Sequence, residues 1–238
     1  MASLQLPNFN VRTHGFSFPN SFPVGSPVID MATPFGRIRI GDAAYGLCGG
    51  MVFAAMDYYL HGADELPATA EQPLFRYFCK RLLDSWNLPF GVLKYYDWQR
   101  RSGSTKSWAG VSRLEGLTRL TIMKEWPRIQ GELNAWRPVA LGLVKAHGYS
   151  LKKLNQNHQV LCYGYDFNEI TQEVSLSIYD PNYPGDDSAR LSFHLLNPDA
   201  EQLIQHSCEG PTVRGLFLTN YSRPVDAPPI PLNSTTDI

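Results

Sequence analysis

The chain is poor in cysteine and has no excess of either charge. Its four cysteines among 238 residues are too dispersed for a disulfide framework, and the lack of Cys-x-x-Cys and His-Glu-x-x-His motifs argues against a dedicated zinc site. A formal net charge of -1, without a block of Lys and Arg, argues against nucleic-acid and anionic-membrane partners. No cofactor-binding fingerprint is present either, so we expect no metal and no cofactor.

Long apolar runs are also missing. No stretch approaches the roughly 20 apolar residues that span a bilayer, and the N-terminal residues lack the basic and apolar regions of a signal peptide. These absences favour a cytoplasmic protein without a membrane partner. Hydrophobic residues nevertheless make up 43% of the chain and charged residues 18%, as in an ordinary globular domain.

Proline marks the two ends of the chain. Residues 1–44 are rich in Pro, Gly, Asn and Ser, which predicts an extended N-terminal arm laid over a domain. Residues 223–238 carry a second group of prolines, which predicts a flexible tail. A single domain is therefore expected over residues 45–222.

Within that domain, helical patterns come first and strand patterns follow. The run from Cys48 to Leu60 is apolar on most sides and predicts a buried central helix, and apolar spacing predicts further helices at about 71–86 and 121–136. Alternation with a period of two predicts strands at Val139–Lys145, His158–Asp166, Glu173–Asp180, Ala189–Leu195 and Val213–Asn220. This order predicts an α+β fold in which the central helix packs on a mostly antiparallel sheet, because a doubly wound parallel sheet would need helices between the strands.

Cys48 stands where a turn should pass into the central helix. A thiol in the first turn of a helix is exposed to unpaired backbone N–H groups and to the positive end of the helix dipole, and both favour the nucleophilic thiolate. Glycines surround it, in Gly46-Leu47-Cys48-Gly49-Gly50. They permit unusual backbone angles and close approach of a substrate to the chain.

His158 and Asp180 belong to consecutive predicted strands. If these strands form a hairpin that turns near Glu169, facing residues have numbers that sum to about 338, which places His158 opposite Asp180 with Cβ atoms roughly 5 Å apart. A carboxylate in that position fixes the imidazole tautomer and stabilises the imidazolium, as the third member of a catalytic triad does. The sequence thus predicts that Cys48, His158 and Asp180 act together as nucleophile, base and orienting residue.

These residues also carry a family resemblance. The segments Gly46-Leu47-Cys48-Gly49-Gly50-Met51, Asn157-His158-Gln159-Val160 and Tyr179-Asp180-Pro181-Asn182 resemble the papain-like cysteine peptidase superfamily. Within it they look like a bacterial branch related to peptidases that cleave leader peptides after a double glycine. The likeness covers roughly residues 40–220 and implies a papain-like fold and thiol hydrolysis of a peptide or amide substrate.

The chain departs from that family in its oxyanion donor. Such peptidases usually carry a Gln about six residues before the cysteine, but residues 41–45 contain none. The backbone N–H of Cys48 is then expected to supply one donor, and Tyr45 or Asn157 the other. Losing one such donor typically lowers turnover on the order of 10²–10³-fold.

Two other readings of the same residues stay open. An acyltransferase or transglutaminase-like enzyme would use the same Cys-His-Asp set to transfer the acyl group to an amine. A catalytically inactive papain-like binding module would keep the fold without turnover. The sequence leaves the substrate and the oligomeric state undetermined.

The remaining histidines and cysteines receive weaker assignments. His147 is the main rival base, although its position after a predicted strand suits an ordinary loop residue. His194 alternates with apolar neighbours and is expected to face solvent, and His206 stands in no informative context. The sequence alone also leaves a bond between Cys162 and Cys208 open.

Overall fold

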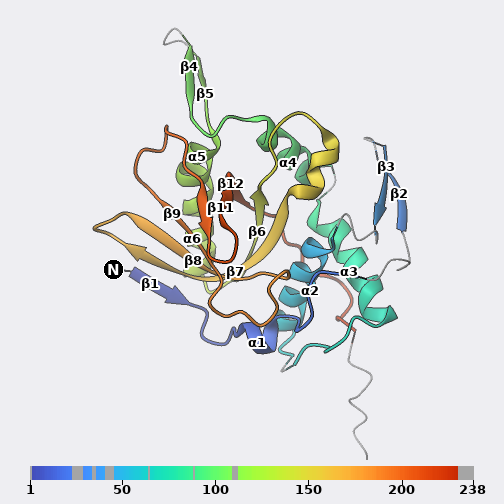
Figure 1. The fold of residues 1–238 in the computed structure, drawn as a ribbon. Helices are drawn as coiled ribbons and strands as arrows, with labels where there is room; N and C mark the ends of the chain where they lie inside the picture. The colour runs from blue at the N-terminus through green and yellow to red at the C-terminus, as the bar shows by residue number, and fades with distance from the viewer. Residues whose placement is uncertain are drawn as a thin grey trace, which may run out of the picture.

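The structure is a computed structural model that describes residues 2–22, 29–33, 36–40, 46–63, 65–87, 89–108 and 112–229. Its helices are α1 (Val11–His14), α2 (Cys48–Leu60), α3 (Gln72–Ser85), α4 (Phe90–Arg100), α5 (Leu117–Leu120) and α6 (Trp126–Asn134), with a π-helical turn at Thr121–Glu125 and a 3-10 turn at Leu151–Gln156. Figure 1 shows most of these helices grouped around one curled sheet.

The main sheet contains β1 (Ala2–Gln5), β6 (Val139–Val144), β7 (His158–Asn168), β8 (Glu173–Tyr179), β9 (Arg190–His194), β10 (Ile204–His206), β11 (Gly210–Val213) and β12 (Gly215–Leu218). The strand order is β11-β10-β9-β8-β7-β6-β12, and β1 pairs with the second half of β7. All these pairings are antiparallel. Two separate hairpins, β2–β3 (Ile29–Thr33 and Gly36–Ile40) and β4–β5 (Lys106–Trp108 and Ser112–Leu114), complete the described strands.

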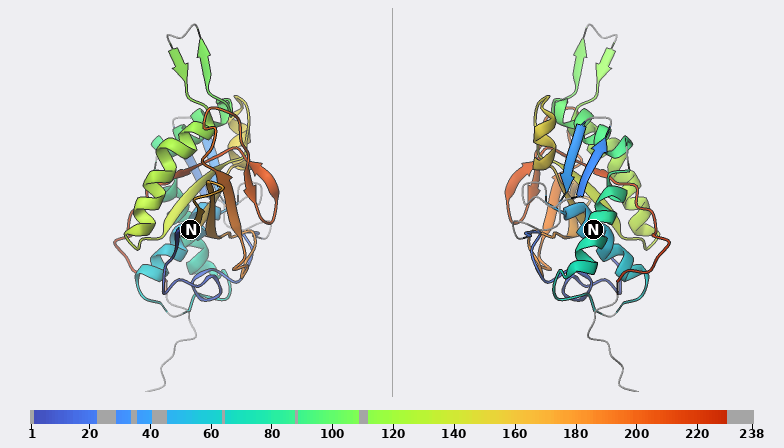
Figure 2. Two further views of the ribbon diagram at one scale, coloured as in Figure 1. Left: turned by 90° about the vertical axis from the view of Figure 1, so that its left-hand side faces the viewer. Right: turned by 90° about the vertical axis from the view of Figure 1, so that its right-hand side faces the viewer.

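Helices cover both faces of the sheet (Figure 2). On β7, Leu161 and Tyr163 join the cluster of buried side chains around α2 and α3, whereas Val160 and Cys162 join the cluster around α6. This alternation follows from the period of two along a strand. The sheet is therefore buried on both sides, which explains why β6 is apolar or glycine at every position.

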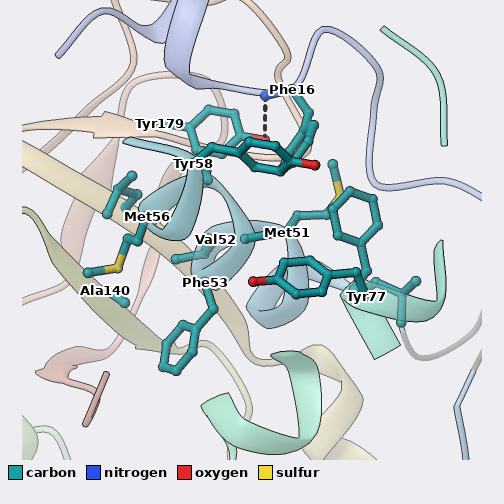
Figure 3. Close-up of a cluster of buried hydrophobic side chains, with 14 of the residues drawn as sticks. Phe16, Met51, Val52, Phe53, Met56, Tyr58, Tyr77, Ala140 and Tyr179 are labelled. Carbon is teal, nitrogen blue, oxygen red and sulfur yellow. Dashed lines mark hydrogen bonds between the residues drawn. The ribbon is translucent and has the colours of Figure 1, made fainter. Parts of the chain in front are cut away.

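Helix α2 is buried along most of its length, as its sequence predicts. Figure 3 shows Met51, Val52 and Phe53 from this helix packed among aromatic side chains of other elements. Gly50 has a specific part in this packing, because a Cβ there would lie 2.1 Å from the carbonyl oxygen of Phe78 in α3. Glycine thus lets the two helices cross at close range.

The N-terminal residues contribute to the folded body. Gln5 of β1 pairs with Gly164 of β7, and the backbone N–H of Phe16 donates to the hydroxyl of Tyr179 at 3.2 Å. Residues 23–28, 34–35 and 41–45 of the expected arm, and 230–238 of the expected tail, lie outside the described residues. The predicted domain boundaries therefore remain predictions.

The structure confirms the coarse α+β class and differs from the sequence reading in particular elements. Helix α4 was not predicted from the sequence. The helix expected at 121–136 belongs to a longer helical stretch that begins at Leu117, passes through the π-helical turn and ends at Asn134. Pro127 lies directly after the π-helical turn, where its missing N–H removes one backbone hydrogen bond from the continuous helical stretch.

Candidate active site

Cys48 is the first residue of α2, and the chain reaches it through a tight turn. Gly46 has a φ of +54°, which favours glycine, and the backbone N–H of Leu47 donates to Oδ1 of Asn20 at 2.7 Å. No side chain in the described part of the chain caps the helix at Leu47, and the backbone N–H of Gly49 donates to the Cys48 thiol. The Cys48 side chain is partly exposed at this position.

Gly49 serves packing rather than an unusual backbone angle. It is helical, and a Cβ there would lie 2.4 Å from Oγ of Ser85 and 2.8 Å from Oε1 of Gln159. Its lack of a side chain therefore lets the first turn of α2 approach both α3 and β7. The glycines on either side of Cys48 were expected to provide backbone freedom, but of these only Gly46 has a positive φ.

His158 and Asp180 do meet, but the predicted register is wrong by two residues near the site. Leu161 pairs with Tyr179, so facing numbers sum to 340 and Asp180 lies just beyond the end of the ladder. An extra residue at Tyr163 then shifts the rest of the hairpin by one more position. Nε2 of His158 nevertheless lies 2.7 Å from Oδ1 of Asp180, because long side chains two positions apart on a diagonal of paired strands are still within reach of each other.

The three side chains form a coupled set of charges. Burial alone would raise the pKa of the Cys48 thiol, but the positive charge of His158, a hydrogen bond from its ring and the backbone N–H groups of Gln159 and Gly49 lower it. Burial alone would lower the pKa of His158, yet the Asp180 carboxylate and the Cys48 thiolate raise it to about 10. The arrangement thus favours a thiolate next to an imidazolium.

Asp180 remains ionised although its side chain is fully buried. Burial alone would raise the pKa of this carboxyl, but the charge of His158 and hydrogen bonds from His158, His206 and the N–H of Asn182 hold the pKa well below its usual range. A carboxylate that does not take up the proton of His158 keeps the imidazolium in place, as a third triad member must.

His206 is the residue that sequence reasoning missed. Its Nε2 lies 3.0 Å from Oδ2 of Asp180, so two histidines share one carboxylate. The three-residue strand β10 carries it, and that strand was not predicted. Ile204 and His206 are both buried on one face of this strand, but three residues are too few for the sequence alone to show it.

The expected oxyanion donors have different outcomes. Tyr45 lies outside the described residues. Oδ1 of Asn157 accepts from the backbone N–H groups of Lys145 and Ala146, both at 3.1 Å, while its Nδ2 is buried and has no hydrogen-bond partner among the described residues. Asn157 therefore holds the loop after β6 in place through these hydrogen bonds. Of the expected oxyanion donors, the backbone N–H of Cys48 is the one that lies at the start of a helix.

The other cysteines are chemically distinct from Cys48. Burial raises the pKa of Cys79 to about 11 and that of Cys162 to about 12, and the pKa of the exposed Cys208 is also raised. All four thiols are free, so Cys162 and Cys208 are not bonded. Only Cys48 of the four has a thiol whose pKa is lowered.

His147 and His194 lie away from this set and are exposed, so His158 is the histidine that the fold brings to Cys48. Among the described residues, no group of three His, Cys, Asp or Glu side chains is placed to hold a metal ion. Nor is any helix in the described ranges long and apolar enough to cross a bilayer.

Replacing Cys48 by Ala should lower the pKa of His158 below its value of about 10. The thiolate contributes both charge and a hydrogen bond to the protonated ring, and both are lost in the variant. NMR titration of the His158 ring protons measures the change, and Cys79→Ala, in the core of α3, is the matched control. An unchanged titration in Cys48→Ala would show that the thiol and the ring do not interact.

Comparison with known proteins gives no match, whether to a family model, to a curated protein or to a solved structure.

Proposed function

We propose that this chain is a thiol hydrolase of papain-like architecture that cleaves a peptide or amide bond through an acyl-enzyme. The observation that carries the proposal is the contact between the Cys48 thiol, whose pKa is lowered, and a histidine held by a buried carboxylate. A helix that begins at the cysteine and an antiparallel sheet that carries His158 and Asp180 support the papain-like reading.

The chemistry follows from these positions. The Cys48 thiolate attacks the carbonyl carbon, a C–S bond forms, and the developing oxyanion is stabilised by backbone N–H groups at the start of α2. His158 gives its proton to the leaving amine as the C–N bond breaks. Water then attacks the acyl-enzyme while His158 takes up a proton from it, and cleavage of the C–S bond restores the thiolate.

Asp180 supports both half-reactions without changing its charge. Since its carboxylate accepts from Nε2 of His158, the other ring nitrogen, Nδ1, is the one directed to the thiol. This orientation fixes the imidazole tautomer in the resting enzyme and stabilises the imidazolium when the thiolate forms.

The rate at which iodoacetamide alkylates Cys48, measured against pH with peptide mapping, tests the proposal without a known substrate. We expect modification well below pH 8, because the thiol pKa is lowered. The other three cysteines are internal controls in the same digest. A rate that rises only near pH 8.5, the ordinary thiol value, would contradict an activated nucleophile.

Hydrolysis itself is tested with a peptide mixture, with and without an amine acceptor. Cys48→Ala should abolish turnover and keep the fold, since the side chain is small and partly exposed. New amide products formed with the acceptor would indicate acyl transfer instead of hydrolysis. Turnover by Cys48→Ala at the wild-type rate would exclude the proposed nucleophile.

A further inference from the structure

Both carboxylate oxygens of Asp180 accept hydrogen bonds. Its Oδ1 accepts from Nε2 of His158 at 2.7 Å and from the N–H of Asn182 at 2.8 Å, and its Oδ2 accepts from Nε2 of His206 at 3.0 Å. The carboxylate is fully buried, and His206 is 1% exposed. Donors on both oxygens fix the rotation of the carboxylate plane, which a partner on one oxygen alone would leave free.

The two histidines around this carboxylate differ in their bonding. The backbone N–H of Cys208 donates to Nδ1 of His206 at 3.1 Å, so that nitrogen accepts and the proton of the ring is on Nε2. His206 is therefore a neutral donor to Asp180. His158, by contrast, faces a carboxylate on one side and a thiol on the other, which favours its charged form.

Several side chains and two strands surround His206. The Tyr183 ring lies 5.8 Å from the His206 ring, and Glu209, the nearest other acidic side chain on its hairpin, is paired with Lys145. His206 itself pairs with Leu191 of β9 and with Gly210 of β11, whose φ is +80°. The outer strand β10 thus places His206 next to Asp180, although the two residues are 26 positions apart in the sequence.

We propose that His206 is a positioning residue of the active site: it holds Asp180 so that Asp180 aligns His158 with Cys48. This role rests on the proposed function, because it acts through the same three residues. Loss of His206 should therefore change both the geometry of the site and the reactivity of Cys48. Without His206, Oδ2 of Asp180 stays buried without this donor, His158 is held less firmly and the Cys48 thiolate loses stabilisation.

His206→Leu should therefore slow alkylation of Cys48 at pH 6 by about tenfold to a hundredfold, the effect of removing a hydrogen bond to a charged group. Near pH 9.5 the same variant should approach the wild-type rate, because the thiol then ionises without help. His206→Gln should restore much of the rate at pH 6, since its amide nitrogen occupies roughly the place of Nε2. His194→Leu, on the exposed face of β9, is the matched control.

The outcomes separate this inference from the function on which it rests. If the wild type shows an activated Cys48 that Asp180→Asn slows, while His206→Leu keeps the wild-type profile, the role of His206 is overturned and the function stands. If the wild type shows no activated thiol, the proposed function itself fails. A uniform loss at all pH values, not restored by His206→Gln, would indicate a purely structural residue and would also overturn the inference.

If His206→Leu fails to fold, the tautomer of His206 in the wild-type protein tests the same role. ¹⁵N NMR of the histidine rings at pH 8 should show His206 as the neutral tautomer with its proton on Nε2, and Asp180→Asn should shift that signal. A proton on Nδ1 would contradict the donor role.

Discussion

Replacing Arg81 by Met is expected to destabilise the protein by about 3–5 kcal/mol, the cost of leaving a buried charge without its partner. Nε and Nη2 of Arg81 donate to the two carboxylate oxygens of Asp57, at 2.7 and 3.0 Å. Both side chains are almost fully buried, so solvent does not screen the pair. The variant keeps a long apolar side chain and removes only the charge and its hydrogen bonds.

The surrounding contacts explain why the effect should be large. Asp57 also accepts from the hydroxyls of Tyr77 and Tyr221, and Arg81 donates to the carbonyl of Ser222, so this pair joins α2, α3 and the segment after β12. Burial raises the pKa of Asp57 even with these partners present. Without Arg81, the carboxyl must be protonated or remain charged in the core, and either costs stability.

Equilibrium unfolding in urea measures this effect, and Lys80→Met provides the matched control one residue away. Lys80 forms an exposed pair with Asp226, so its replacement should change the unfolding free energy by no more than about 0.5 kcal/mol. The double variant Asp57→Asn/Arg81→Met should lose less than the sum of its single variants, because no fully buried charge is left without its partner; Asp84, the second partner of Arg81, is 38% exposed. Equal losses in Arg81→Met and Lys80→Met would contradict a buried pair of this importance.

The elements that were predictable from sequence are those with local, repeated signals. Helix α2 has an apolar run, β6 is apolar or glycine throughout, and β7, β8 and β9 are apolar or alternating segments of five or more residues, so their class and approximate bounds follow from pattern alone. Strand β10 has three residues, too few for alternation to stand out. Strand β1 lies in a segment whose composition suggested an arm, and its place beside β7 is a tertiary pairing with no local signal.

The same distinction between local and tertiary signals applies to the residues of the candidate site. Cys48, His158 and Asp180 were identifiable because each stands at the start or end of a strongly patterned element. The register between two of them was missed because the hairpin turns between Asn168 and Glu173 and not at Glu169; the extra residue at Tyr163 reduces the miss from three positions to two near the site. His206 was missed because only the folded sheet brings its short strand to Asp180. Local sequence patterns therefore do not predict side chains, such as His206, that contact a site from a strand distant in the sequence.

Replacing His158 by Ala should lower kcat/KM for hydrolysis on the order of 10²–10⁴-fold, the usual contribution of a general acid and base. The ring supplies the charge and a hydrogen bond that lower the pKa of Cys48, so its loss leaves burial to raise that pKa. Alkylation of Cys48 at pH 6 should therefore fall as well, while the rate above pH 9 recovers as the thiol ionises.

His147→Ala is the control for this second prediction, because His147 is exposed and was the rival base in the sequence. It should leave both hydrolysis and alkylation within about twofold of wild type, as surface substitutions usually do. The direction of the pH effect is the decisive readout. A thiolate held by an imidazolium persists on the acid side of the ordinary thiol pKa, and the wild-type advantage over His158→Ala must therefore grow as the pH falls from 9 to 6. A constant ratio between the two rates over that range would mean that His158 does not activate Cys48, and the charge coupling on which the proposed mechanism depends would be absent.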